Sequence, residues 1–263
     1  MADLNDNLVV SDQAIANKKI IIEQFKATVK GKKPDTLKAN IKHSGKEGHW
    51  LELAMGLKLN RSNSPDLLGF EMKNNTSGKT TFGDWSADYY IYKDNAYNIA
   101  RDDFIALFGK SNLKKNGRFS WSGEPFPKIG DFNNFGQKLN VDEDGNIVAL
   151  YSFSNDRRAD KAVILPPRFQ QEDLVLARWE AVTLQTKLEN KFNQNGWFKC
   201  IKNSNGVYVS IVFGAPINYE NWIELVRRGI VFLDSGMYQG NKRPYSNWRA
   251  DNKLWESLVV SAH

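Results

Sequence analysis

An acidic segment near residue 70 carries side chains of the types that bind a metal ion and hydrolyse a phosphate ester. Glu71 and Lys73 stand two residues apart in the run Gly-Phe-Glu-Met-Lys, so on a strand both side chains point to the same face. Asp66 precedes them across a bend that contains Gly69, and this bend would turn its carboxylate back toward Glu71. Mg²⁺ prefers oxygen ligands and is usually bound by one or two carboxylates together with phosphate oxygens and water. The segment is therefore typical of phosphodiester hydrolysis, with the lysine orienting or activating the attacking water.

This short pattern also has a structural explanation. An acid followed at a variable distance by acid-x-Lys arises by chance on the order of once in a chain of this size, and a solvated edge strand would carry it equally well. Glu52 adds an independent observation, because it lies among Leu51, Leu53 and Met55 in an expected helix that is apolar nearly all round and therefore buried. A buried carboxylate needs a partner. We expect Glu52 to meet a metal ion, a lysine or a hydrogen-bond network, and an exposed strip of the helix is the alternative.

Hydrophobic periodicity and turn residues predict the elements that hold these side chains. The expected helices cover residues 11–30, 35–41, 46–58, 95–108, 171–190, 218–228 and 250–259. The expected strands cover residues 65–73, 79–85, 87–92, 161–165 and 230–233, with hairpins turning at 116–117, 143–146 and 203–206. The strand at 79–85 is expected to return antiparallel to the acidic strand, which places the acidic strand in a sheet.

Composition indicates an ordered globular protein with an anionic partner. The chain has 263 residues, of which 41% are hydrophobic, and this is enough to bury the core of one large domain or two lobes. A net charge of +6 favours nucleic acid as the partner. The single cysteine, Cys200, excludes an internal disulfide and a cysteine-rich zinc site and favours a reducing compartment. No signal peptide is recognisable, and no apolar run approaches the roughly 20 residues that span a bilayer, so we expect a cytoplasmic protein without membrane contact.

A second informative segment runs from residue 234 to residue 249 and is expected to form a long loop, which in a compact domain is usually functional. Arginine and lysine can bind guanine, amides can bind adenine, and an acid can accept a hydrogen bond from cytosine. A surface loop held by aromatic packing is the alternative. The candidate DNA contacts in this segment are Asp234, Tyr238, Gln239, Asn241, Lys242, Arg243 and Arg249. Weaker candidates elsewhere are Lys79, Thr81, Lys114, Lys115 and Arg118.

Four positions in register resemble one nuclease family. Glu52 is followed after fourteen residues by Asp66, after five more by Glu71 and after two more by Lys73. With Thr80-Thr81-Phe82, this order resembles the PD-(D/E)xK nucleases of the MutH, MvaI and BcnI type. The resemblance covers roughly residues 45 to 85, and four positions in register are far more specific than three.

The resemblance implies a mixed α/β (α+β) fold in which helices flank a restriction-endonuclease-like core sheet, with a second lobe that grips DNA. We expect one nuclease domain over residues 1–263 with two lobes. The catalytic lobe would cover about residues 1–110. The DNA-recognition lobe would cover about residues 111–263, with part of the core returning.

The resemblance also implies roles for the acidic segment. Asp66 and Glu71 would bind Mg²⁺ with help from the Met72 backbone carbonyl. Lys73 would stand near the nucleophilic water, and Glu52 would assist the metal site or hold Lys73.

The function implied is that of a type II site-specific deoxyribonuclease that acts as a monomer on double-stranded DNA and leaves 5′-phosphates. Such an enzyme would reside in a prokaryotic cytoplasm, with a cognate DNA methyltransferase as its genetic partner. The alternatives are a MutH-like mismatch-repair nickase, which needs partner proteins, and a non-catalytic DNA-binding module. A glycoside hydrolase ranks last, because paired acids alone leave Lys73 unexplained.

Overall fold

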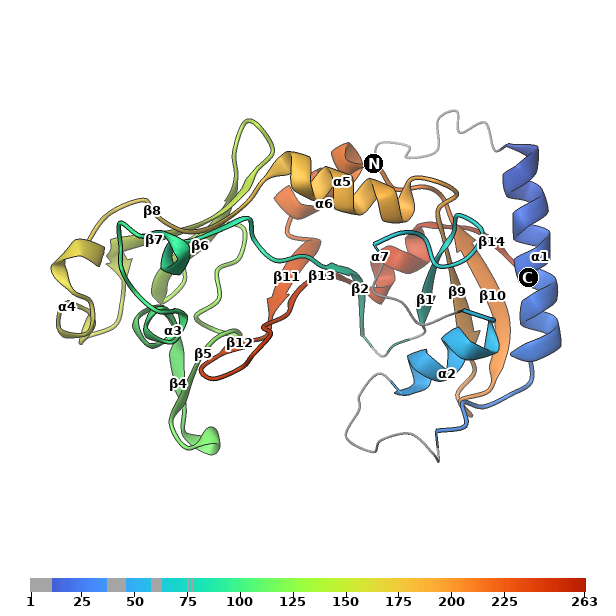
Figure 1. Ribbon diagram of the computed structural model, residues 1–263, viewed down its shortest axis with the longest axis horizontal. Coiled ribbons are helices and arrows are strands. Elements are labelled where there is room, and N and C mark those ends of the chain that lie inside the picture. The colour runs from blue at the N-terminus through green and yellow to red at the C-terminus, as the bar shows by residue number, and fades with distance from the viewer. Residues whose placement is uncertain (1–10, 37–45, 58–62, 75, 77) are drawn as a thin grey trace. The chain divides into compact units, whose positions relative to one another are not determined.

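The computed structural model describes residues 11–36, 46–57, 63–74, 76 and 78–263, and the chain divides into two compact units (Figure 1). The first unit comprises Met1–Thr80, Lys187–Asn221 and Asn252–His263. The second comprises Thr81–Thr186 and Trp222–Asp251. Most of the helix expected at 35–41 lies outside the described residues. Within the described ranges, no helix is both long and apolar enough to cross a membrane.

A four-stranded sheet forms the centre of the first unit. Its strands, in spatial order, are β1 (Glu71–Asn74), β9 (Trp197–Lys202), β10 (Tyr208–Gly214) and β14 (Val259–Ala262). The edge strand β1 runs parallel to β9, whereas β9 with β10 and β10 with β14 are antiparallel pairs. In the β1–β9 pair, Glu71 stands opposite Trp197 and Lys73 opposite Lys199. The strand that contains Glu71 and Lys73 is therefore held in the sheet by a segment more than a hundred residues later in the chain.

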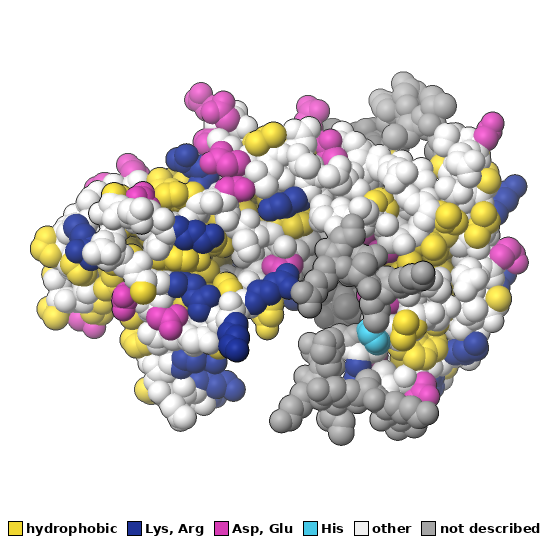
Figure 2. Space-filling view, viewed as in Figure 1, with side chains coloured by type: hydrophobic (Ala, Val, Ile, Leu, Met, Phe, Trp, Pro, Cys, Tyr) yellow, Lys and Arg dark blue, Asp and Glu magenta, His cyan; other side chains and the backbone are white. Residues whose placement is uncertain are grey.

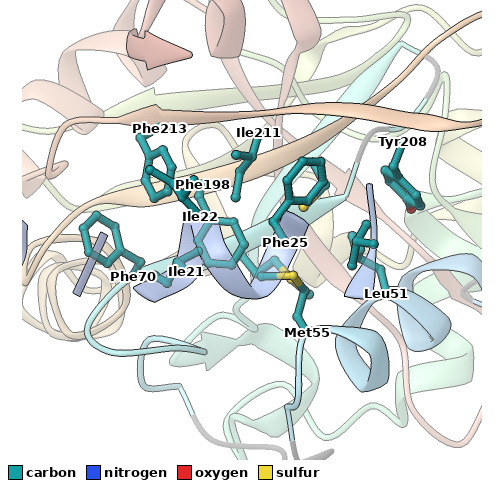
Figure 3. Packing of buried hydrophobic residues seen from close by; sticks show 13 residues of the cluster. Ile21, Ile22, Phe25, Leu51, Met55, Phe70, Phe198, Tyr208, Ile211 and Phe213 are labelled. Atoms are coloured by element: carbon teal, nitrogen blue, oxygen red, sulfur yellow. The ribbon is translucent and has the colours of Figure 1, made fainter. Parts of the chain in front are cut away.

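One face of this sheet packs against helices α1 (Asp12–Thr28) and α2 (Lys46–Ala54). Figure 3 shows the resulting cluster, which contains Phe25 of α1 and Leu51 of α2 together with Phe198, Tyr208 and Phe213 of the strands. α1 begins as expected, because the hydroxyl of Ser11 accepts a hydrogen bond from the Ala14 amide. The cluster fixes which face of each strand is turned toward the core.

Strand alternation then sends the polar residues of β1 to the opposite face. Met72 lies in the cluster described above, so Glu71 and Lys73 point away from it, as predicted. This second face is covered by α7 (Asn252–Ser257) and by the last turns of α5 (Ala181–Phe192), whose Phe192 ring stacks near Trp255. The sheet of the first unit therefore lies between two helical layers, and the acidic site is on the α5 and α7 side.

The second unit is built from smaller sheets. One contains β12 (Met237–Tyr238), β5 (Arg118–Trp121) and β4 (Lys110–Asn112). Another contains β3 (Tyr89–Tyr90), β8 (Leu174–Trp179), β7 (Ile147–Asp156) and β6 (Phe135–Val141). A third sheet contains β11 (Val231–Ser235), β13 (Ser246–Asp251) and β2 (Lys79–Asp84). Buried Trp85, Trp179, Trp222 and Trp248 contact one another edge to face and form an aromatic core.

Short helices complete the chain. They are α3 (Arg101–Phe108), α4 (Lys161–Ile164), α6 (Tyr219–Arg227) and the 3₁₀ turns Ile91–Lys93, Leu113–Lys115 and Pro167–Phe169. The hairpins predicted at 116–117, 143–146 and 203–206 are confirmed as β4–β5, β6–β7 and β9–β10. The expected fold class, mixed α/β with sheets flanked by helices, is also confirmed.

Two predicted elements between residues 161 and 190 have the wrong type, the first over its N-terminal half and the second throughout. The helix expected at 171–190 is the strand β8 followed by α5. Leu174, Leu176 and Trp179 are spaced by two and then three residues, because the register of β8 against β7 shifts between Val175 and Ala177. Pairing of β8 with β3 and β7 decides in favour of the strand. The strand expected at 161–165 is the helix α4, in which the carbonyl of Asp160 accepts a hydrogen bond from the Ile164 amide.

Two further predictions are wrong for reasons of tertiary pairing. The strand at 79–85 does form, as β2, but it belongs to the sheet of β11 and β13 and does not pair with β1. The long loop expected at 234–249 contains β12 and the first part of β13, and the helix expected at 250–259 shrinks to α7, followed by β14. These short strands are recognisable only from the strands that they pair with.

Candidate active site

A tight turn brings the two halves of the acidic segment together. Leu67 and Phe70 exchange backbone hydrogen bonds of 3.0 and 2.9 Å, and the two residues between them, Leu68 and Gly69, have φ angles of 50° and 83°. Positive φ at both central positions gives a sharp two-residue reversal. A Cβ atom at position 69 would overlap the side chain of Asn195. The backbone N–H of Asn195 donates a hydrogen bond of 3.0 Å to the Gly69 carbonyl. The positive φ of the turn is thus the main reason for glycine at this position.

The turn places the carboxylates of Asp66 and Glu71 side by side. Asp66 Oδ2 accepts a hydrogen bond of 2.9 Å from the Met72 amide. Glu71 is 2% exposed, and its Oε2 atom is buried without a hydrogen-bond partner in the part of the chain that the structure describes. The residue Asp66 is exposed, but its carboxylate is partly desolvated. This loss of hydration, and to a smaller extent the negative charge of Glu71, raises the pKa of Asp66 to about 7. Two adjacent carboxylates of this kind call for a proton or a cation between them.

Because of this raised pKa, the stability of the metal-free protein is expected to depend on pH through Asp66. The folded pKa of about 7 exceeds the usual 3.8, so protonation of Asp66 stabilises the fold fully below about pH 4, and this contribution is lost as the pH rises through 7. Asp66→Asn keeps an oxygen that accepts from Met72 but cannot titrate. Its urea midpoint in EDTA should fall less than that of the wild type between about pH 4 and 8.

The matched control is Asp144→Asn, at an exposed position of the β6–β7 turn. It should retain the wild-type pH dependence. Equal pH dependence of the Asp66→Asn variant and the wild type would contradict the raised pKa.

Two lysines hold Glu71. Lys73 Nζ lies 2.8 Å from Glu71 Oε1, which confirms that the two side chains share one face of β1. Burial lowers the pKa of Lys73, although the charge of Glu71 opposes this shift. Lys191 Nζ, from the last turn of α5, lies 3.0 Å from the same oxygen. Both lysines are thus within hydrogen-bond distance of the same Glu71 oxygen, and the ring of Phe192 lies 4.9 Å from Lys73 Nζ.

Lys191 was not recognised from the sequence. It stands 120 residues after Glu71, and α5 reaches β1 only because the following strand, β9, pairs in parallel with β1. A prediction of that pairing would have placed the end of α5 beside the acidic turn, but no local pattern in the sequence indicates it.

Glu52 approaches this group from α2. Burial raises its pKa, His49 and Lys191 oppose the shift, and the charge of Glu71 adds to it. Glu52 is half-buried, whereas the sequence suggested a helix buried all round. The difference arises because Leu51 fills the core while Leu53 is 55% exposed, so α2 has only one buried face. The pKa of Glu52 nonetheless responds to the charges of Glu71 and Lys191.

The donor set fits a hard divalent cation. Glu71 Oε2 has no protein partner among the described residues, and it lies beside the carboxylate of Asp66. No group of three or more His, Cys, Asp or Glu side chains suited to a metal occurs in the described residues, so the two carboxylates leave room for a backbone carbonyl, phosphate oxygens and water. This oxygen-only arrangement suits Mg²⁺ better than zinc.

A second group of candidate residues lies on β11 and β13 in the second unit. Along these strands Asp234, Asn247 and Arg249 are half-buried, whereas the residues that alternate with them are buried. Asp234 Oδ2 and Arg249 Nη1 are 3.3 Å apart, and Arg249 Nε is buried without a hydrogen-bond partner in the described structure. The partly exposed face of this pair of strands thus presents an acid, an amide and a guanidinium group together.

The amides of the neighbouring segment are engaged within the unit. Gln239 Oε1 accepts a hydrogen bond of 2.9 Å from the Phe119 amide, and Asn241, which is 7% exposed, donates to the Gly236 carbonyl at 3.0 Å. Lys242 is exposed, and so is Arg243, which lies 3.4 Å from Asp84.

Basic residues gather on the β4–β5 hairpin. Lys114 and Lys115 are exposed at its tip, and the guanidinium of Arg118 lies 3.7 Å from the centre of the Tyr238 ring. Figure 2 shows several Lys and Arg side chains in the lower part of this unit, where Figure 1 places the hairpin. Of the two remaining candidates on β2, Lys79 is exposed and Thr81 is half-buried.

Comparison with known structures defines the class of this fold. The complex of restriction endonuclease MvaI with its cognate DNA aligns with a TM-score of 0.60 at 12% identity, covering 96% of this chain and 98% of MvaI. The fold is that of an MvaI-type restriction endonuclease, as the resemblance of the acidic segment predicted.

Sequence comparison then gives the family. A model of the LlaMI restriction endonuclease family matches residues 29–263. Type II restriction enzyme ScrFI from Lactococcus lactis subsp. cremoris is 51% identical over 267 residues, which cover 94% of this chain and 98% of that protein. The chain belongs to the LlaMI restriction endonuclease family. The prediction of a type II restriction endonuclease is thereby confirmed at the level of enzyme class.

Proposed function

We propose that this restriction endonuclease uses Mg²⁺ to hydrolyse one phosphodiester bond per strand within a short specific sequence of double-stranded DNA, leaving 5′-phosphates. The observation that carries the proposal is the buried, unpartnered Oε2 atom of Glu71 beside the carboxylate of Asp66. Restriction enzymes cut at sites defined by sequence, so the proposal assigns catalysis to the first unit and DNA recognition to the second. We further propose a monomeric enzyme whose genetic partner is a cognate DNA methyltransferase.

In this mechanism Asp66 and Glu71 hold the cation, with the Met72 carbonyl as a third ligand. Mg²⁺ bound there would polarise the scissile phosphate and lower the pKa of a water molecule. Asp66 must lose its proton to act as a ligand, and because its pKa is about 7, metal binding near neutral pH should release protons. Glu52, whose charge is coupled to Glu71, would assist the metal site.

Lys73 would orient the attacking water. Its ammonium group is fixed on Glu71 Oε1 at 2.8 Å and is almost completely buried, so its position is set before substrate arrives. Burial lowers its pKa, which makes the loss and return of a proton easier than for a solvated lysine. The water would then attack in line and the 3′-oxygen would leave.

For sequence recognition, Asp234 and Arg249 are the best-supported readers. A carboxylate can accept a hydrogen bond from cytosine N4, and a guanidinium can bind guanine O6 and N7, so the pair suits the major-groove edge of a G·C pair. Their 3.3 Å contact occupies these groups in the free protein, and the buried Nε of Arg249 still lacks a partner within the described residues.

Other cations would position the duplex. Lys114 and Lys115 at the hairpin tip suit phosphate oxygens, as do exposed Lys242 and Arg243. Arg118, held against Tyr238, would enter a groove or contact a phosphate. Gln239 and Asn241 would support this surface from within, since their amides bind backbone groups. Lys79 and Thr81 remain weaker candidates for backbone contact.

Digestion of a sequenced plasmid tests the proposal. With Mg²⁺ the purified enzyme should yield discrete fragments whose ends share a short sequence and can be ligated without kinase treatment, because they carry 5′-phosphates. EDTA should prevent cutting. Nicked circles without linear product would favour a strand nickase, and binding without cleavage in Mg²⁺ would favour a non-catalytic module.

A further inference from the structure

Two lysine ammonium groups pair with the single carboxylate of Glu71, although one of them would neutralise it. Its Oε1 atom accepts from Lys73 at 2.8 Å and from Lys191 at 3.0 Å, while its Oε2 atom has no hydrogen bond within the described structure. Lys73 comes from the same strand, but Lys191 is delivered by a separate helix, α5. A single buried lysine is enough to pair one carboxylate, so the second ammonium group requires its own explanation.

The geometry of the pair indicates what that explanation is. In the metal-free protein, the ammonium groups of Lys73 and Lys191 share one oxygen atom of Glu71, so this oxygen is paired twice. The reaction adds a scissile phosphate, on which negative charge must be stabilised as the bond breaks. Beside a bound Mg²⁺, a cationic side chain that is already held near the carboxylates and is able to move would add to that stabilisation.

Lys191 meets both requirements. Its side chain is 18% exposed, compared with 10% for Lys73, and it projects from the last turn of α5 on a flexible four-carbon stem. Its ammonium group can therefore turn from Glu71 toward a ligand without displacement of the helix. Lys73 is fixed by its neighbours on the strand and under the ring of Phe192.

We propose that Lys191 is a further catalytic residue, which pairs with Glu71 in the free enzyme and turns to a non-bridging oxygen of the scissile phosphate when DNA binds. This rests on the proposed function, because it requires a phosphodiester substrate at this site. The competing role is purely positioning, in which Lys191 only fixes the carboxylate of Glu71.

The two roles predict opposite effects on metal binding. If Lys191 only positions Glu71, its removal loosens the ligand, and second-sphere changes of this kind weaken metal affinity about 10- to 100-fold. If Lys191 serves the phosphate, its removal takes a cation away from the carboxylates, and metal should bind equally well or more tightly. Cleavage should then slow even when metal is saturating.

The test uses Lys191→Met, which removes the charge, and Lys191→Gln, which removes the charge but keeps an N–H donor for Glu71. Mn²⁺ binding to the DNA-free protein is measured by electron paramagnetic resonance, and single-turnover cleavage is measured at saturating Mg²⁺ on a duplex carrying the mapped site. Both variants should bind Mn²⁺ at least as tightly as the wild type and cut about 100-fold more slowly. Lys191→Arg should recover most of the rate.

Lys26→Met is the matched control, because Lys26 also pairs with a glutamate, Glu23, at 2.9 Å, but on the exposed side of α1. It should leave both measurements unchanged. Weaker Mn²⁺ binding with a normal rate at saturating metal, or rescue by Lys191→Gln, would overturn the proposal, and so would unchanged behaviour of both variants. Failure of the wild type to cut DNA would instead overturn the proposed function. Thermal melting shows whether each variant is folded. If Lys191→Met is unstable, the test rests on Lys191→Gln alone.

Discussion

Lys73→Ala is expected to slow DNA cleavage by about 10²- to 10⁴-fold, the range associated with loss of a positioned proton-transfer group. Lys73 is 9% exposed and lies 2.8 Å from Glu71, and the proposed mechanism assigns to it the orientation of the attacking water. The loss should appear in single-turnover rates at saturating Mg²⁺. Duplex affinity, measured by gel shift with Ca²⁺ in place of Mg²⁺, should remain within about threefold of the wild type, since Lys73 is buried and makes no groove contact.

The fold should tolerate this change because Lys191 continues to pair with Glu71 at 3.0 Å. Lys202→Ala is the matched control, since Lys202 also forms a lysine–glutamate pair in the first unit, 2.6 Å from Glu47. Asp66→Ala should be as inactive as Lys73→Ala, because it removes a proposed metal ligand. Normal cleavage by purified Lys73→Ala or Asp66→Ala protein would remove the basis of the active-site assignment.

The local part of this site follows directly from the sequence. Strand alternation places Glu71 and Lys73 on one face, and the Gly69 turn returns Asp66 to the Met72 amide. Each of these relations spans only a few residues, so it depends on backbone geometry that the sequence encodes at that point. The predicted grouping of these residues rests on such local rules.

The remaining part depends on contacts between distant segments. Lys191 reaches Glu71 only through the parallel pairing of β1 with β9, and β2 leaves β1 for the sheet of β11 and β13. The apolar residues from Leu174 to Trp179 break strict alternation at a register shift, so the strand is recognisable only from its neighbours in the sheet. Sequence patterns therefore predicted the grouping of Glu71 and Lys73 on the acidic strand, but not the helix α5, which contributes the second lysine that pairs with Glu71.

The candidate DNA-contacting residues show the same division between what local sequence patterns predict and what contacts between distant segments decide. The residue types at 234–249 indicated base contacts, but the expected loop gave no reason to prefer one side chain over another. In the structure, the alternation of β11 and β13 separates Asp234 and Arg249, on the partly exposed face, from buried Trp248. Gln239, by contrast, accepts a hydrogen bond from the Phe119 amide. Strand geometry thus reduces seven candidates to a pair that can be tested directly.

Arg249→Ala is expected to lower cleavage efficiency at the mapped site by about 1–3 kcal/mol, or roughly 5- to 150-fold, and to relax selectivity at one base pair. The reason is that a guanidinium that binds guanine O6 and N7 loses both hydrogen bonds, whereas duplexes with another base at that position never formed them. The measurement is kcat/KM on the mapped duplex and on duplexes with each single base pair changed. Asp234→Ala should relax selectivity at the same or an adjacent pair, because its carboxylate lies 3.3 Å from Arg249.

Arg228→Ala, at an exposed position after α6, is the matched arginine control and should leave the ratios between duplexes unchanged. A uniform loss across all duplexes in the Arg249→Ala variant, with a smaller dependence of binding on salt, would assign Arg249 to a phosphate instead. Either outcome separates the two kinds of contact, because a base contact changes the ratio between sequences, while a phosphate contact changes affinity for all of them.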